Sequence, residues 1–185
     1  MTPWKRAPLL CAAIAGGIAT GWWVRTQGAP RLDPAPADRA WQRGQGDRLV
    51  EYFDPACEGS RSVHKLLDQE FARGGFQHIM IPVAIGRGAD SVPADALCAL
   101  PDEQVWQKAS TWAQTPPRHP ERGMDLDTLD ACASSVEAAT QHIATLSPDG
   151  KVMTPVVEFR GHVYVGVEST SELLAALQQT STPAP

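Results

Sequence analysis

The chain has 185 residues, a formal net charge of −5 and a hydrophobic content of 43%. This length suffices for one ordinary domain with appendages, and the acidic balance argues against a basic face for nucleic acid. The four cysteines, Cys11, Cys57, Cys98 and Cys132, are too few to build a disulfide-based miniprotein, so a packed core must hold the fold.

Residues 1–25 have the pattern of a targeting segment. A basic start with Lys5 and Arg6 precedes the uncharged run Ala7–Val24. A run of about 18 apolar residues is at the low end of a bilayer span, and the basic start should stay cytoplasmic, which exports the rest of the chain. We expect an uncleaved signal anchor in the inner membrane. A signal peptide cleaved near Ala19–Gly21 is the alternative.

Composition divides the remaining chain into three parts. Residues 26–46 are rich in Pro, Ala, Gly and Arg without an apolar period, which predicts a flexible linker. Residues 47–179 form the predicted domain, with a helical insertion at about 94–147. Residues 180–185 are expected to be a disordered tail.

The first half of the domain alternates strand and helix patterns. Residues 48–53 and 76–85 are mostly apolar, which predicts two buried strands. Between them, the apolar residues of 63–71 recur at helical spacing, and Gly74–Gly75 ends that helix.

The insertion and the C-terminal part continue this pattern. Residues 101–114 and 129–146 have the apolar period of amphipathic helices. Residues 154–159 and 162–167 are short β runs separated by Arg160–Gly161, which predicts a hairpin.

A last helix should follow the hairpin, started by a capping box between Ser169 and Glu172. Strand, helix, strand, helical segment, hairpin and closing helix is the plan of a small α/β sheet covered by helices.

Three stretches make the domain resemble the thioredoxin superfamily, and most closely its periplasmic disulfide isomerases of the DsbC and DsbG group. "EYFDPACEGS" (51–60) looks like the junction that presents the active cysteine of that family. "MTPVVEFRGHVYVG" (153–166) looks like the stretch with its cis-proline, and "IPVAIGRGADSVPADALCAL" (81–100) like its second strand and the start of its insertion. The resemblance covers about 48–179 and lacks the dimerisation domain of the isomerases. It implies a thioredoxin-like fold with a helical insertion.

Cys57 is the candidate nucleophile. It follows a strand and opens a helix, where free N–H groups and the helix dipole favour a thiolate, although Glu58 beside it opposes a second negative charge. The alternative is a small buried helix residue. The resemblance also implies that Thr154-Pro155 is the cis-proline site that docks an extended substrate chain beside Cys57.

Ser60 stands where the family has its second active cysteine. A serine hydroxyl can donate a hydrogen bond to the Cys57 thiolate but is far too weak an acid to resolve a mixed disulfide. A lone thiolate still permits isomerisation or reversible capture of a partner.

Two further ionisable residues lie near Cys57 in sequence. Glu51 is six residues before it, where some thioredoxin-like proteins keep a buried proton acceptor; an edge-strand glutamate facing water is the equal alternative. His64 lies one helical turn beyond Ser60 and is expected to be solvated, with tuning of the Cys57 thiolate as the alternative.

Cys98 and Cys132 lie at the two ends of the insertion, where the isomerases have a structural disulfide. The resemblance therefore implies a Cys98–Cys132 disulfide that leaves Cys57 single, while the rival pairing joins Cys57 to one of them. No metal or other cofactor is expected, because the sequence has no C-x-x-C motif and His78, His119, His142 and His162 share no ligand spacing.

Two functions fit these features. The first is a membrane-tethered thiol–disulfide exchange protein of the bacterial envelope, which isomerises or captures exported proteins through Cys57. The second is a non-catalytic thioredoxin-like adaptor of an envelope assembly, such as a conjugative or secretion apparatus. Neither function calls for nucleic acid as a partner.

Overall fold

The structure is a computed structural model that describes residues 39–85, 91–115, 125–147 and 150–179. The predicted anchor at residues 1–25 and the predicted tail at 180–185 lie outside these ranges. Within the described part of the chain, no helix is both long and apolar enough to cross a membrane.

A five-stranded sheet forms the centre of the domain, with the strand order β1-β3-β2-β4-β5. β2 and β3 are parallel, and the other three neighbouring pairs are antiparallel. The strands are β1 (Trp41–Gly44), β2 (Asp47–Phe53), β3 (Phe76–Pro82), β4 (Val156–Phe159) and β5 (His162–Val165). The two predicted strands and the predicted hairpin are therefore present, and β2 lies at the middle of the sheet.

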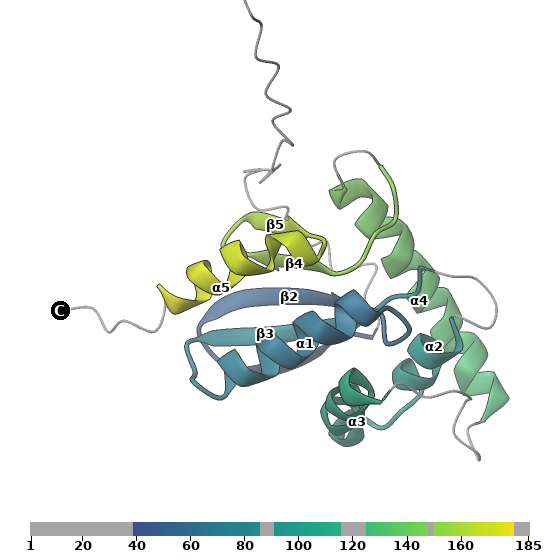
Figure 1. Ribbon diagram of the computed structural model, residues 1–185. Helices are drawn as coiled ribbons and strands as arrows, with labels where there is room; N and C mark the ends of the chain where they lie inside the picture. Colours follow the sequence, from purple (N-terminus) through teal and green to yellow (C-terminus); the bar gives the residue numbers. More distant parts are fainter. Residues whose placement is uncertain (1–38, 86–90, 116–124, 148–149, 180–185) are drawn as a thin grey trace, which may run out of the picture.

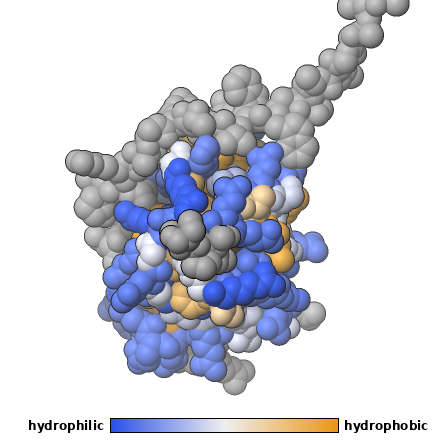
Figure 2. Space-filling view, turned by 90° about the vertical axis from the view of Figure 1, so that its left-hand side faces the viewer, coloured by the Kyte–Doolittle hydropathy of each residue, from blue (hydrophilic) through white to orange (hydrophobic). Residues whose placement is uncertain are grey.

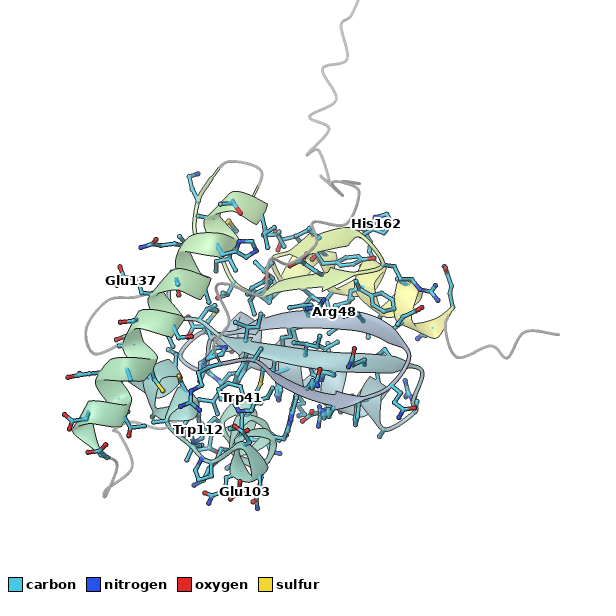
Figure 3. All side chains as sticks on the ribbon, turned by 180° about the vertical axis from the view of Figure 1, so that it is seen from behind. Trp41, Arg48, Glu103, Trp112, Glu137 and His162 are labelled. Carbon is cyan, nitrogen blue, oxygen red and sulfur yellow. The ribbon has the colours of Figure 1, made fainter. Side chains whose placement is uncertain are left out.

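Strand β1 lies inside the segment that its composition assigned to the linker. It pairs antiparallel with β3, from Trp41 opposite Met80 to Gly44 opposite Gln77. The Trp41 ring is buried, and its Nε1 donates to Asp102 Oδ1 at 2.9 Å. In Figure 3 it lies in the same region as Trp112 of the insertion, with which it shares one apolar cluster. The prediction was wrong here because this strand has no apolar run of its own and is made by its partners.

In the described ranges, five α-helices and one 3-10 turn pack around the sheet: α1 (Glu58–Phe71), α2 (Val92–Cys98), α3 (Asp102–Gln114), α4 (Leu126–Leu146), α5 (Thr170–Gln178) and η2 (Val167–Ser169). Figure 1 shows α1 and α5 lying across one face of the sheet. Alternation along β2 explains the layers, because Leu49 packs in one apolar cluster with residues of α1 and α5, whereas Tyr52 packs in another with Ala139 and Ile143 of α4.

The hairpin forms as predicted, but the capping box does not. The hairpin turn has Arg160 at φ 50° and Gly161 at φ 78°, a left-handed pair that reverses the chain. Ser169 ends the 3-10 turn with helical backbone angles, and its hydroxyl donates back to the Gly166 carbonyl at 2.9 Å. A capping serine needs extended backbone angles, so the preceding 3-10 turn removes the predicted cap.

Cys98 ends α2, and Cys132 lies in α4. Both are buried in the same apolar cluster, and burial, followed by the neighbouring Cys132 thiol, raises the pKa of Cys98. The structure records both as free thiols. The disulfide implied by the resemblance therefore stays a prediction, now between two side chains in contact.

We predict that oxidation joins these two sulfurs. A crosslink closing a loop of this length stabilises by roughly 4 kcal/mol in the chain-entropy model. Non-reducing peptide mapping should recover the Cys98–Cys132 pair, and urea unfolding with and without reductant should show the stability difference. Full alkylation of both thiols in unfolded, never-reduced protein would contradict the prediction.

Candidate active site

The segment Asp54–Cys57 is a tight turn between β2 and α1. The Cys57 N–H donates to the Asp54 carbonyl at 3.1 Å, and the Ala56 N–H donates to Asp54 Oδ1 at 2.8 Å. Asp at the first position and Pro at the second are the residues that such turns prefer. The turn therefore ends the strand and places Cys57 at the N-cap of α1, with an extended backbone at φ −81° and ψ 122°.

Cys57 meets the predicted proline site across the sequence. Its side chain is half-buried, and Sγ lies 3.8 Å from the Thr154 carbonyl oxygen, next to a cis Thr154-Pro155 peptide bond. A Cβ at Gly59 would lie only 3.2 Å from Pro155 Cδ and 2.9 Å from Val167 Cγ1. The absent side chain of Gly59 therefore lets the proline ring and η2 close over the start of α1.

Ser60 is fully buried, and its Oγ accepts the Asp54 N–H at 2.9 Å. The oxygen predicted to assist the Cys57 thiolate thus holds the turn in place. Ser60 acts on Cys57 through the backbone of the turn, and the site has a hydroxyl where a resolving thiol would stand.

Three large apolar side chains are exposed in the described part of the chain: Ile85, Met153 and Val167. The Ile85 N–H donates to Asp54 Oδ2 at 3.1 Å, Met153 directly precedes Thr154, and Val167 lies against Gly59. All three therefore border the Cys57 turn, and we call them the apolar rim. The end of the molecule where β3 begins and α5 ends, seen in Figure 2, is mostly hydrophilic.

Glu51 is buried in the middle of the sheet, so it is neither on an edge strand nor facing water. Its Oε2 lies 2.7 Å from His64 Nδ1 and 2.9 Å from His78 Nε2. His64 is itself fully buried, so the expectation of a solvated histidine was wrong. It is covered because α3 packs on α1, and the rings of Phe53 and Trp106 lie at 4.5 Å and 6.5 Å from its own.

Arg43 identifies the proton positions on His78. Its NH2 lies 3.1 Å from His78 Nδ1. A guanidinium can only donate, so Nδ1 accepts and the proton of His78 is on Nε2, directed at Glu51. His78 is therefore a neutral donor to Glu51, and His64 is the histidine whose charged form the carboxylates of Glu51 and Asp68 favour.

Asp68 closes this group of side chains into a ring. It pairs with Arg43, its Oδ2 accepts from Ser110 Oγ at 2.6 Å, and the same oxygen lies 3.8 Å from His64 Nε2. The guanidinium of Arg43 lies over the Trp106 ring at 4.0 Å. Two anions and two cations alternate around the ring, which links β1, β2, β3, α1 and α3.

Electrostatics move the two histidines in opposite directions. Burial raises the pKa of Glu51, but attraction to His64 and hydrogen bonds from both histidines outweigh it and lower that pKa to about 2. Burial lowers the pKa of His64, but the charge of Glu51 outweighs it and the net shift is upward. Burial is the main cause that lowers the pKa of His78.

Glu51, His64 and His78 also have the chemistry of metal ligands, and one ligand atom of each lies within 4.8 Å of the others. Both imidazole nitrogens, however, are directed at Glu51 Oε2 itself. A metal on His78 Nε2 would also require the proton on Nδ1, against the donating Arg43. The residues therefore fit a hydrogen-bonded carboxylate better than a coordination shell.

Sequence reasoning did not recognise Asp54 or His78 as part of the site, and it expected a solvated side chain for His64. Asp-Pro ahead of a helix was a usable turn signal for Asp54. His78 alternates with Phe76 and Met80 on one face of β3, so its burial was also readable. The spacing of histidines in the sequence could not identify the group of Glu51, His64 and His78, because these residues come from β2, α1 and β3.

A parallel β2–β3 pair, a thiol at the start of the intervening helix and a cis-proline ahead of an antiparallel hairpin together define a thioredoxin-like fold. No model of a protein family matches the sequence, and neither does any curated protein.

Solved structures do match. The thiol-disulfide exchange protein alpha-DsbA2 from Wolbachia pipientis aligns with a TM-score of 0.61 and 15% identity over 75% of this chain and 86% of that one. ScsC from Proteus mirabilis, in a transitional conformation, aligns with a TM-score of 0.55 and 12% identity over 77% of this chain and 72% of that one. A thioredoxin-like oxidoreductase from Silicibacter pomeroyi DSS-3 aligns with a TM-score of 0.54 and 20% identity over 78% of this chain and 94% of that one. Identities this low show the shared fold alone, and these neighbours are DsbA-like rather than members of the DsbC and DsbG group.

We predict that the free energy of unfolding is highest near pH 6.5. The raised pKa of His64 gives stability that is complete below its ordinary value of 6.5 and is lost as the pH rises through the folded-state value. The lowered pKa of His78 gives stability that is present above 6.5 and is lost as the pH falls through its folded-state value. Urea unfolding across this range measures both sides of the maximum.

The variant His64→Gln separates the two contributions. It keeps a donor toward Glu51 but has no charge, so it should cost about 3 kcal/mol at pH 6 and less at higher pH, where the wild type loses the same charge. A flat wild-type profile, or an unchanged alkaline decline in His64→Gln, would show that the ring does not titrate as argued.

Proposed function

We propose that this protein is a thiol–disulfide exchange protein in which Cys57 is the single nucleophile. One observation carries the proposal: a half-buried thiol at the N-terminus of α1 has its Sγ 3.8 Å from the carbonyl that precedes a cis-proline. The field of the helix N-terminus favours the thiolate, which is the reactive form. The fold shared with alpha-DsbA2, a thiol-disulfide exchange protein, supports the same chemistry.

The reaction balances without an external oxidant or reductant. The Cys57 thiolate attacks one sulfur of a substrate disulfide, a new S–S bond forms, and the other substrate sulfur leaves as a thiolate. A second thiol of the same substrate, or a small thiol, then attacks the mixed disulfide and restores Cys57. The product is a rearranged disulfide, or a captured partner when no second thiol arrives.

The substrate class is an extended, cysteine-containing segment of an exported protein. The Pro155 carbonyl already accepts the Gly166 N–H at 2.9 Å, so the backbone of Thr154 is the part of this strand that faces Cys57. An incoming chain would pair there by adding to the strand, and its apolar side chains would contact the apolar rim.

Ser60 limits the activity to isomerisation or capture, which are the functions of an isomerase like those of the DsbC and DsbG group or of a holding adaptor. The adaptor is the second candidate, favoured by Ser60, whose Oγ accepts the Asp54 N–H of the turn and which offers no second thiol. In either case we place the domain in the bacterial envelope, tethered to the inner membrane by residues 1–25.

Trapping tests the central step. Wild-type protein incubated with a peptide disulfide should gain one peptide through Cys57, identified by non-reducing peptide mapping, and Cys57→Ala should gain none. Absence of the adduct in the wild type defeats the exchange proposal. An adduct without reshuffling of a scrambled substrate, in the presence of a small thiol, would leave capture as the function.

Ser60→Cys should add the missing resolving thiol. With a dithiol reductant, the wild type should reduce insulin little faster than the reductant alone, because only the reductant can release its mixed disulfide, whereas Ser60→Cys should accelerate the reaction clearly. The change removes a good acceptor for the Asp54 N–H, so the free energy of unfolding should fall by about 1 kcal/mol. Ser60→Ala is the matched control, with a similar loss of stability and no such acceleration of insulin reduction. An inert but folded Ser60→Cys would show that position 60 does not face the mixed disulfide.

A further inference from the structure

Two oppositely charged side chains hold the turn that presents Cys57. The carboxylate of Asp54 accepts the N–H groups of Ala56 and Ile85, at 2.8 Å and 3.1 Å. The guanidinium of Arg61 donates to the carbonyl oxygens of Pro55 and Ala56, at 3.0 Å and 2.9 Å. The turn residues between Asp54 and Cys57 are therefore bonded to an anion through an N–H and to a cation through their carbonyls.

The position of Arg61 needs an explanation. A cation in the first turn of a helix faces the positive end of the helix dipole, which is unfavourable. Arg61 lies there because its side chain folds back onto the turn carbonyls, and its own N–H makes the first helical bond to the Cys57 carbonyl at 3.0 Å. This places a positive charge on the turn that ends at Cys57, where it favours a thiolate.

The negative charge of Asp54, held on the same turn, has the opposite effect on a thiolate. Its carbonyl accepts the Cys57 N–H at 3.1 Å, and the ends of such a turn are less than about 7 Å apart. Asp54 is buried, whereas Glu58 beside the thiol is exposed. A buried carboxylate is screened less by water and salt than an exposed one.

We propose that Asp54 and Arg61 are positioning residues that set the acidity of Cys57 in opposite directions from the two sides of its turn. The inference rests on the proposed function, because it concerns the thiolate that would carry the exchange. Asp54 opposes the thiolate and Arg61 favours it, so their balance sets how much of Cys57 is reactive at neutral pH. Thr154 faces Cys57 through a neutral carbonyl, and among the described residues the carboxylate of Glu168 in η2 lies against Gly166.

The test is the pH profile of Cys57 alkylation in the full chain, followed by mass spectrometry of the peptide that contains Cys57. Asp54→Asn should shift the midpoint to lower pH by about one unit, and Arg61→Gln should shift it to higher pH by a similar amount. Arg61→Lys keeps the charge but not the two-carbonyl fork, so its midpoint should lie between those of Arg61→Gln and the wild type.

Two variants with the same charge changes serve as controls. Asp47→Asn at the start of β2 and Arg73→Gln after α1 are at the far ends of their elements and should leave the midpoint unchanged. A purely structural role would lower stability without moving the two midpoints in opposite directions. Shifts of the same sign, or no shift in either variant, overturn the proposal.

Folding and function are separated by design. Asp54→Asn loses the acceptor for Ile85, and if it does not fold, Arg61→Gln and Arg61→Lys decide the outcome by themselves. Peptide-disulfide trapping on the same wild-type sample tests the exchange function independently. If the alkylation midpoints shift but no peptide adduct forms, the charge balance is supported and the exchange proposal fails. If the adduct forms but the midpoints do not move, the exchange proposal is supported and the charge balance fails.

Discussion

The buried carboxylate of Glu51 is the constraint on which the rest of the structure depends. A charge at the centre of a sheet is costly to desolvate unless it is paired and hydrogen-bonded. This chain supplies His64 from α1 and His78 from β3, both on one carboxylate oxygen. These bonds hold α1 in one rotation about its axis against the sheet. Because Cys57 begins the same helix, the Glu51 contacts also help to fix where the thiol emerges.

At the start of α1 the chain solves a second problem, which is how to end a buried strand and present a thiol within four residues. The Asp54 side chain replaces backbone acceptors that the turn lacks, and Ser60 satisfies the Asp54 N–H. The same groups leave the site with one thiol and no resolving partner. Ser60 thus stabilises the turn and, in the proposed exchange, leaves Cys57 without a resolving thiol.

The fold is shared with proteins that are at most 20% identical among those compared, so one arrangement of strands and helices is built from largely different residues. In this chain the arrangement places a thiol at a helix N-terminus, with a proline ring closing over it. The histidine pair on Glu51 and the two charges at the Cys57 turn hold the helix that begins there.

The sequence by itself determined the elements with strong local signals: the strands around 48–53 and 76–85, the helices of the insertion and the Arg160–Gly161 hairpin. It also placed Cys57 at a helix start, because a strand, a breaker and an amphipathic period follow one another there. Only the tertiary structure decided the rest. β1 forms only through its pairing with β3. Glu51 and His64 are buried by elements distant in sequence, and the 3-10 turn before α5 prevents Ser169 from capping that helix. Propensity and periodicity describe a residue and its neighbours within a turn or two, whereas burial, ion pairing and register depend on segments that meet only when the chain has folded.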